Sequence, residues 1–395
     1  PPQGGRESTS ATFAVLAPTP TWAYKGLMYD PSASPSTSAT ARVTVDLDAM
    51  AANWRTIRDL TGAEAAAVVK ADAYGLGAAR AADRLWAEGA RRFFVARISE
   101  GQALRRSLGD RPAVIYVLDG CPPGQAGALL DADLTPVLNS LAQVSAYAAF
   151  AAGADRPLKA ALHVDTGMNR LGLRVEETRA LAQETARLAK LEVEMVMSHL
   201  ACADEPGHPL NRRQRDAFAD VCGLFPNALK SFANSGGCFL GRDYAFDLVR
   251  PGIGVYGGGP EGRPDARIAP VATLDAEVVQ VRVVPPGETV GYSCGWTATE
   301  TTRVAILGVG YADGVLRSNS PHGRVWLNGT ECRILGRVSM DLTAVDVSAC
   351  DTVAPGDRAE LFGREIAIDT AAERAGTIAY ELLTRLAPRL ERRWV

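Results

Sequence analysis

The sequence is poor in net charge, in paired cysteines and in long apolar runs, and each shortage excludes a class of protein. Its net charge of −3 gives no reason to expect binding to nucleic acid or to a charged membrane. The seven cysteines are odd in number and lack CxxC spacing, which argues against a zinc site and a disulfide framework. No apolar stretch approaches the ~20 residues that cross a bilayer. We therefore expect a metal-free, cytoplasmic protein.

The first 40 residues also lack the apolar residues that a core requires. They are rich in Pro, Ser, Thr and Ala, and such a segment buries too little apolar surface to order itself. The weakly apolar piece at 11–17 is followed by Pro18 and Pro20, which is not typical of a signal peptide. We predict a disordered extension over residues 1–40.

The remainder of the 395-residue chain is long enough for two domains, and its first part alternates between apolar runs and helix-forming segments. Continuous apolar runs of strand length, separated by helices, are typical of a parallel sheet. Eight such units in roughly 200 residues predict a (β/α)8 TIM-type barrel over residues 41–262, with a doubly wound sheet as the alternative. The runs lie at 65–70, 92–97, 113–118, 134–139, 159–165, 193–199, 229–235 and 247–251.

After residue 262 the pattern changes to short β-type runs separated by Pro-Gly, Asn-Gly and Gly-Asp turn signals. This pattern predicts a mostly-β second domain over residues 263–395. The early run at 41–45 precedes the barrel, and we expect it to pair with the second domain. The predicted fold class is therefore α/β, a TIM-type barrel followed by a mostly-β C-terminal domain.

Polar side chains follow several of the predicted barrel strands at the point where each strand ends. In a barrel of this kind the chemistry gathers at the carboxyl ends of the strands. Lys70 is the most informative of them, because a cation that ends an apolar strand is costly unless it is paired, neutralised or used chemically. We therefore predict a reactive amine at Lys70. The other strand-end residues are Asp165, His199, Asn234, Ser235 and Arg250.

A glycine-rich segment, Arg-Pro-Gly-Ile-Gly-Val-Tyr-Gly at 250–257, follows the eighth strand. It contains a GxGxxG match, but its position far from an N-terminal βαβ unit argues against dinucleotide binding. A glycine-rich loop after the last barrel strand is better interpreted as a phosphate cradle, formed by Gly252 and Ile253 with the hydroxyls of Ser235 and Tyr74. A reactive lysine beside a phosphate site indicates pyridoxal 5′-phosphate (PLP), which binds lysine as a Schiff base.

These residues carry a resemblance to a known family. The segment Val-Lys-Ala-Asp-Ala-Tyr-Gly-Leu-Gly at 69–77 resembles the PLP-lysine signature of the alanine racemase family, whose members are PLP-dependent enzymes of fold type III. Further segments similar to that family follow in the same order and extend the resemblance over about residues 41–395. They lie at 165–170, 198–204, 233–235, 249–253, 256–257, 291–292, 296–298, 310–314 and 336–341.

The resemblance implies an enzyme that racemises alanine or a similar small amino acid such as serine. It implies that Lys70 holds the cofactor and acts as one catalytic base, and that Tyr292 of a partner subunit acts as the other, so the enzyme would be a homodimer with shared active sites. Arg170 would bind both cofactor and substrate. The remaining cofactor contacts would be Tyr74, His199, Ser235, Arg250, Gly252, Ile253 and Tyr380, and the remaining substrate contacts Tyr311 and Met340.

Elementary chemistry agrees with these implied roles. Racemisation removes a proton from one face of a planar intermediate and returns it to the other, which two bases on opposite faces can do. An arginine beside the pyridine nitrogen keeps that nitrogen unprotonated, because two adjacent positive charges are unfavourable. D-amino-acid biosynthesis is the expected setting.

Three positions depart from the pattern of the family. His163 stands where a lysine is usual, Ser231 stands where a histidine is usual, and residues 293–295 are Ser-Cys-Gly. We expect these positions to influence rate and substrate preference more than fold. Our hypothesis is that neutral His163, or a bound anion, orients Arg170.

Two other functions compete with a racemase. A barrel-type PLP decarboxylase of basic amino acids would use a cysteine of the second domain, for which Cys294 is a candidate, but its pyridine-nitrogen partner would be acidic. A PLP-carrier protein would need only the barrel, so the second domain with Tyr292 argues against it.

Overall fold

The structure, a computed structural model, describes residues 39–395. The predicted extension over residues 1–40 lies outside the described residues except for its last two. One of these, Thr40, donates its hydroxyl proton to the Gly308 carbonyl oxygen at 2.8 Å. None of the helices in this described part of the chain is long and apolar enough to cross a membrane.

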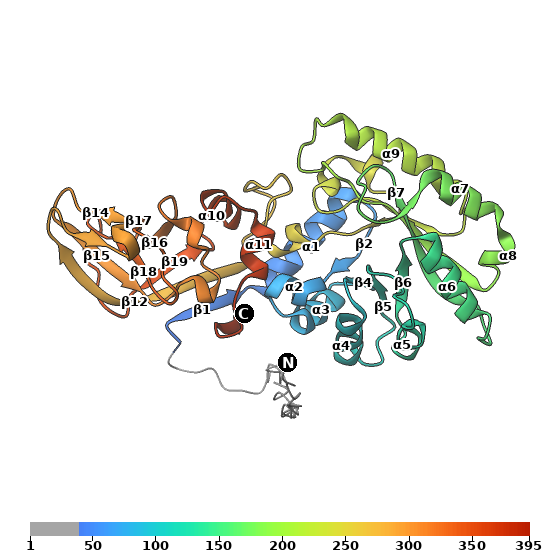
Figure 1. Ribbon diagram of the computed structural model, residues 1–395, viewed down its shortest axis with the longest axis horizontal. Coiled ribbons are helices and arrows are strands. Elements are labelled where there is room, and N and C mark those ends of the chain that lie inside the picture. The colour runs from blue at the N-terminus through green and yellow to red at the C-terminus, as the bar shows by residue number, and fades with distance from the viewer. Residues whose placement is uncertain (1–38) are drawn as a thin grey trace, which may run out of the picture. The chain divides into compact units, whose positions relative to one another are not determined.

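A closed parallel barrel forms the first part of the described chain (Figure 1). The order of its strands is β2-β11-β10-β9-β7-β6-β5-β4-β3, and only Ala66 separates β2 from β3, so the two ends of this order are halves of one strand. The predicted (β/α)8 barrel is therefore confirmed. Its strands are β2 (Glu64–Ala65), β3 (Ala67–Val68), β4 (Arg92–Val95), β5 (Val114–Val117), β6 (Thr135–Leu138), β7 (Leu158–Asp165), β9 (Leu191–Met197), β10 (Leu229–Ser231) and β11 (Leu248–Val249), and β8 (Leu173–Arg174) pairs with β7.

Helices surround the barrel strands on the outside (Figure 1). The first of them begins after Asp46, whose carboxylate caps it by accepting from the Ala49 N–H at 2.8 Å. It ends at Gly62, whose φ of 68° suits glycine. The helices are α1 (Leu47–Thr61), α2 (Lys70–Gly75), α3 (Ala78–Ala87), α4 (Ile98–Leu108), α5 (Ala126–Asp131), α6 (Leu141–Ala151), α7 (Val175–Gln183), α8 (Thr185–Leu188) and α9 (Pro209–Cys222), with 3-10 turns η1 (Gly237–Phe239), η2 (Arg242–Tyr244) and η3 (Ile253–Tyr256).

Several barrel strands are shorter than predicted at their carboxyl ends. The run predicted at 229–235 is paired only over Leu229–Ser231, and the run at 247–251 only over Leu248–Val249. Most of the residues that follow these strands are still buried, although they lie in loops. Their apolar pattern therefore made the predicted strands too long. Lys70 is likewise not in a strand but is the first residue of α2. The polar residues Asn234, Ser235 and Arg250 thus stand on loops beyond the paired strands, whereas Asp165 is the last residue of β7.

Antiparallel strands form a second, closed barrel in the C-terminal part. The sheet order is β15-β18-β17-β16-β19-β12-β1-β20, and β12 also pairs with β15, which closes the ring. β1 (Ala41–Val45) pairs with β12 over all five of its residues. The elements are β12 (Ala272–Val284), β13 (Thr289–Val290), β14 (Trp296–Thr297), β15 (Thr302–Leu307), β16 (Arg324–Leu327), β17 (Thr330–Leu335), β18 (Thr343–Asp346), β19 (Arg358–Phe362) and β20 (Glu391–Trp394), with turns η4 (Tyr292–Cys294), η5 (Tyr311–Asp313) and η6 (Arg317–Asn319) and helices α10 (Ile368–Arg374) and α11 (Ala379–Thr384).

All seven cysteines lie among the described residues, and none forms a disulfide. Two of the cysteines lie close together, since the buried Sγ atoms of Cys332 and Cys350 are 3.4 Å apart. This proximity could not be read from their separation of 18 residues, since it depends on the pairing of β17 with β18.

Candidate active site

Lys70 follows β3 at the carboxyl end of the barrel and begins α2. Four consecutive non-glycine residues after it, from Ala71 to Tyr74, have φ between 51° and 59°, so this single turn is left-handed. A left-handed helical residue costs about 1–2 kcal/mol, and four of them cost roughly 4–8 kcal/mol. Such strain persists only where the surroundings impose it, which is typical of functional sites.

Two sets of contacts hold this left-handed turn. The Glu100 carboxylate accepts from the Ala71 N–H at 2.8 Å and, with its other oxygen, from the Ala96 N–H at 2.7 Å. The buried ring of Tyr74 packs against Tyr256, with the ring centroids 4.8 Å apart. These contacts direct Lys70 and Tyr74 to the same side of the turn, and both line one cavity.

Replacing Ala71 with glycine should stabilise the protein. Ala71 is exposed, so the change removes little packing and relieves the left-handed strain of one residue. We expect a gain of about 0.5–1 kcal/mol after the larger chain entropy of unfolded glycine is subtracted. The matched control is Ala103→Gly, at an exposed position inside the right-handed helix α4, which should lose about 1 kcal/mol. Urea unfolding of the two variants measures both values, and a loss for Ala71→Gly would contradict a left-handed turn.

A cavity of about 630 Å³ brings together the predicted cofactor residues. Its lining comes from the loops that follow the barrel strands, as expected for a barrel of this type. Residues from all around the sheet meet there, together with α11 of the C-terminal part. Among the lining residues are Lys70, Tyr74, His163, Arg170, His199, Ser235, Arg250, Gly252, Ile253 and Tyr380.

The environment of Lys70 favours its neutral amine. Burial is the largest cause that lowers the pKa of Lys70, and the positive charge of Arg170 is the next. Glu100 and Asp119 oppose this and raise the pKa. A neutral amine is the form that acts as a nucleophile or as a base, so the site suits a reactive lysine.

Arg250 is a buried cation, 5% exposed, whose acceptors are all neutral. Its guanidinium donates to Ser231 Oγ and to the Ser198 carbonyl oxygen, both at 2.6 Å. Burial lowers the pKa of Arg250 to about 10. Among the described residues no carboxylate forms a salt bridge with Arg250, so its buried charge is stabilised by neutral acceptors alone. Ser231, one of the departures from the family pattern, thus contacts Arg250 through a neutral hydroxyl group.

Two histidines of the cavity are held in their neutral forms. His199 Nδ1 lies 3.4 Å from a nitrogen of Arg250, and it must accept this bond because a guanidinium only donates. Burial is the largest cause that lowers the pKa of His199 well below its usual value, and Arg250 adds to it. The pKa of His163 is also lowered, to about 4, first by burial and then by the positive charges of Arg250 and Arg170.

The proton of His163 can be assigned to one nitrogen from its neighbour Asn139. The Asn139 amide donates to the carbonyl oxygens of Leu118 and Val137 at 2.8 and 2.9 Å, which fixes its orientation. Its Oδ1 therefore accepts from His163 Nδ1 at 2.8 Å, and the lone pair of His163 is left on Nε2. The neutral form of His163 is the one that our hypothesis requires, and its role in orienting Arg170 stays a prediction.

Three hydroxyl groups provide donors for an oxyanion in the cavity. Ser235 Oγ accepts from the N–H groups of Gly252 and Gly254 at 2.8 and 3.1 Å, so its own proton stays free to donate. Tyr74 and Tyr380 line the same cavity. A Cβ atom at residue 252 would collide with Tyr74 Oη, so only glycine fits there. The Gly252 N–H, predicted to meet the phosphate directly, is instead directed at Ser235.

Arg170 reaches the cavity from an ordered loop. The Asp165 carboxylate at the end of β7 accepts from the N–H groups of Gly167 and Met168, both at 2.9 Å. Asn169 then takes a left-handed conformation with φ of 54°, and Arg170 follows it. The strand-end residue Asp165 therefore acts by shaping the loop and not by lining the cavity.

Three predicted site residues do not line the cavity. Tyr292, Tyr311 and Met340 belong to the C-terminal part, and their side chains are 70%, 44% and 53% exposed. Large apolar or aromatic side chains left exposed near one another mark a surface for another molecule. Within one chain the cavity therefore contains one predicted base, Lys70, and lacks the other.

Sequence reasoning missed Asn139, Asp119 and Glu100. Asn139 directly follows β6 and Asp119 lies two residues after β5, so the rule used for the other strand ends would have found both. Glu100 lies inside α4 and is brought against the turn after Lys70 only by the fold, so no local signal marks it.

Comparisons with known proteins agree with this geometry. Residues 45–260 match the family described as "Alanine racemase, N-terminal domain", and residues 271–394 match "Alanine racemase, C-terminal domain". A relative from Methylobacterium sp. strain 4-46, named alanine racemase, is 46% identical over 358 residues, which cover 90% of this chain and 98% of that protein.

Two solved structures are similar as well. The alanine racemase from Bartonella henselae with covalently bound pyridoxal phosphate has a TM-score of 0.86 and 36% identity, covering 90% of this chain and all of that one. The alanine racemase from Streptomyces coelicolor has a TM-score of 0.85 and 35% identity, covering 90% and 98%. With both domains matched along their length, the chain belongs to the alanine racemase family.

Proposed function

We propose that the protein is an alanine racemase that uses PLP and interconverts L- and D-alanine by a two-base mechanism. The observation that carries the proposal is the cavity at the carboxyl end of the barrel, where an amine with a lowered pKa stands beside two arginines, two neutral histidines and three hydroxyl groups. A family of alanine racemases with the same two domains supports it.

The residues of the cavity fit PLP in charge and in donor set. The hydroxyls of Ser235, Tyr74 and Tyr380 suit the phosphate, and Lys70 suits the aldehyde. Arg250, whose acceptors are all neutral, suits the pyridine nitrogen, because that nitrogen can accept a further hydrogen bond from the guanidinium. Since an arginine stays protonated even with a pKa near 10, this nitrogen would remain unprotonated.

The chemistry that PLP supplies when bound is the withdrawal of electrons from the substrate α-carbon. The chain itself must move the proton. Lys70 Nζ, once neutral, takes the α-proton from one face of the substrate or returns it there, and Tyr292 Oη does the same at the opposite face. Arg170, at the rim of the cavity, binds the substrate carboxylate and so orients the α-carbon between the two bases.

The second base makes the proposed enzyme a homodimer. Tyr292 lines no part of the cavity that contains Lys70, which supports its completion by the tyrosine of a partner subunit. The exposed Tyr292, Tyr311 and Met340 support this arrangement, because a partner would cover them and gain a gate for its substrate. A cytoplasmic location stays a prediction, supported by cysteines that form no disulfide in the described part of the chain.

The test is a panel of L-amino acids assayed for their D-enantiomers with the purified, PLP-loaded protein. We expect alanine to be turned over fastest, because the relatives that cover this chain are named alanine racemases, and serine more slowly. Release of carbon dioxide from lysine or ornithine would instead support the decarboxylase, and bound PLP without any turnover would support the carrier protein.

A further inference from the structure

The loops that carry the exposed residues of the C-terminal part are joined by one segment, residues 336–341. At one end of it, Arg337 Nη1 donates to Ser293 Oγ at 2.8 Å, next to Tyr292. Toward the other end, the N–H groups of Tyr311 and Ala312 donate to the carbonyl oxygens of Ser339 and Met340 at 3.0 and 2.9 Å. We call the exposed residues Tyr292, Tyr311 and Met340 the docking face.

Backbone contact alone does not fix the two loops that carry Tyr311 and Met340. A Cβ atom at residue 310 would collide with the Met340 carbonyl oxygen, so the loops approach each other as closely as glycine allows. Two hydrogen bonds in exposed loops, however, open readily unless side chains support them.

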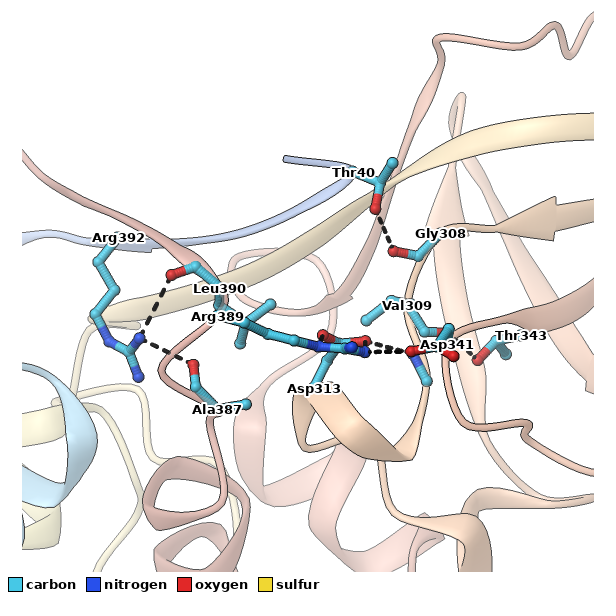
Figure 2. A network of polar contacts seen from close by, with 11 residues as sticks. Thr40, Gly308, Val309, Asp313, Asp341, Thr343, Ala387, Arg389, Leu390 and Arg392 are labelled. Atoms are coloured by element: carbon cyan, nitrogen blue, oxygen red, sulfur yellow. Dashed lines mark hydrogen bonds and ion pairs between the residues drawn. The ribbon is translucent and has the colours of Figure 1, made fainter. Parts of the chain in front are cut away.

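Arg389, in the C-terminal segment, connects the two loops that carry Tyr311 and Met340 (Figure 2). Its Nε and Nη2 donate to the two carboxylate oxygens of Asp313 at 2.6 and 2.9 Å, and Nη2 also donates to Asp341 Oδ1 at 2.7 Å. Asp313 lies two residues after Tyr311, and Asp341 directly follows Met340. One guanidinium therefore bridges the two loops at the residues next to the docking face.

The contacts of Arg389 with Asp313 and Asp341 are more firmly oriented than those of a typical surface ion pair. Asp313 is buried, and its Oδ2 also accepts from the Gly310 N–H at 2.9 Å, so it is already fixed in its loop. The Asp313 contact is the bidentate fork that arginine forms best and lysine cannot. Asp313 and then Asp341 hold the pKa of Arg389 above its usual value. Without Arg389 the two carboxylates would face each other uncompensated.

We propose that Arg389 is a positioning residue for racemisation, which clamps the loops of Tyr311 and Met340 in the arrangement that enters the active site of the partner subunit. This inference rests on the proposed function, because that function gives the docking face its role. Arg389 itself does not line the cavity that contains Lys70, and in this proposal it acts only through the two loops.

The test compares Arg389→Gln, Arg389→Lys and a matched control, Arg393→Gln. Arg393 has the same exposed side-chain fraction as Arg389, 49%, and likewise pairs with a carboxylate that is 8% exposed, but its partner Glu391 lies in β20 and not in either loop. Arg389→Gln should raise KM for alanine and lower kcat/KM about 10- to 100-fold, because misplacing a substrate contact by 1 Å has effects of this size. Arg389→Lys should fall between the wild type and Arg389→Gln, and the control should match the wild type.

A second readout does not depend on activity. The amide protons of Tyr311 and Ala312 should exchange with deuterium roughly 10-fold faster in Arg389→Gln than in the wild type, and no faster in Arg393→Gln. Asp341→Asn, which weakens the bridge from the other side, should accelerate the same two amides. These experiments use the full-length, PLP-loaded protein.

The outcomes separate this inference from the proposed function. Faster exchange with a raised KM supports the clamp and its positioning role. If the wild type racemises alanine but Arg389→Gln behaves like Arg393→Gln in both readouts, the clamp is overturned and the function stands. If the wild type does not racemise any amino acid, the function fails, and the positioning role fails with it even where exchange is faster.

Discussion

Replacing Lys70 with alanine should lower racemisation of alanine by at least about 10³-fold, because the change removes both a base and the anchor of the cofactor. Among residues 39–395, Lys70 provides the one amine that lines the cavity, and burial together with Arg170 lowers its pKa toward the reactive neutral form. The measurement is the rate of D-alanine formation, together with the PLP that remains on the protein after dialysis.

Two control variants make the Lys70 result specific. Lys190→Ala removes an exposed lysine just after α8 that does not line the cavity, and should leave the rate unchanged. Lys70→Arg keeps a positive charge, but a guanidinium does not lose its proton, so this variant should be as inactive as Lys70→Ala. Racemisation by Lys70→Ala within 10-fold of the wild type would contradict the role of Lys70.

The barrel was predictable because its strands are buried on both faces and therefore read as unbroken apolar runs. The same property made the predicted strands too long, since the loops after β10 and β11 stay buried as well. The end of the chain was harder. Neither β19 nor α11 was predicted, and α11 matters because it brings Tyr380 to the cavity. Its six residues are too few for a helical period to be visible in the sequence.

The local geometry of the reactive lysine could not have been predicted. The residues from Ala71 to Tyr74 include no glycine, and single-residue preferences favour a right-handed turn for all of them. The left-handed turn is imposed by Glu100, which is 30 positions away from Lys70, and by the packing of Tyr74 on Tyr256. By contrast, the strand-end rule found Lys70, His199, Ser235 and Arg250 without any knowledge of these contacts.

Mixing two inactive variants, Lys70→Ala and Tyr292→Phe, should restore activity if the two bases come from different subunits. Each homodimer alone is expected to be inactive, because every site lacks one of the bases. After unfolding or dissociation and random reassembly, half of the dimers are mixed, and one of the two sites in each mixed dimer combines an intact Lys70 with an intact Tyr292. About one quarter of the wild-type activity should therefore return.

The same experiment distinguishes a shared site from a site made within one chain. If Tyr292 completed the cavity of its own chain, every chain in the mixture would still lack one base, and no activity would return. Tyr292 is 70% exposed and absent from the cavity lining, which favours the shared site. A mixture of Lys70→Ala with Lys70→Arg serves as the control, since no combination of these subunits contains both bases. An intact Lys70 of one subunit can meet an intact Tyr292 of the other only at the interface between the subunits. Recovery of activity would therefore also establish that the dimer is required for catalysis and not only for stability.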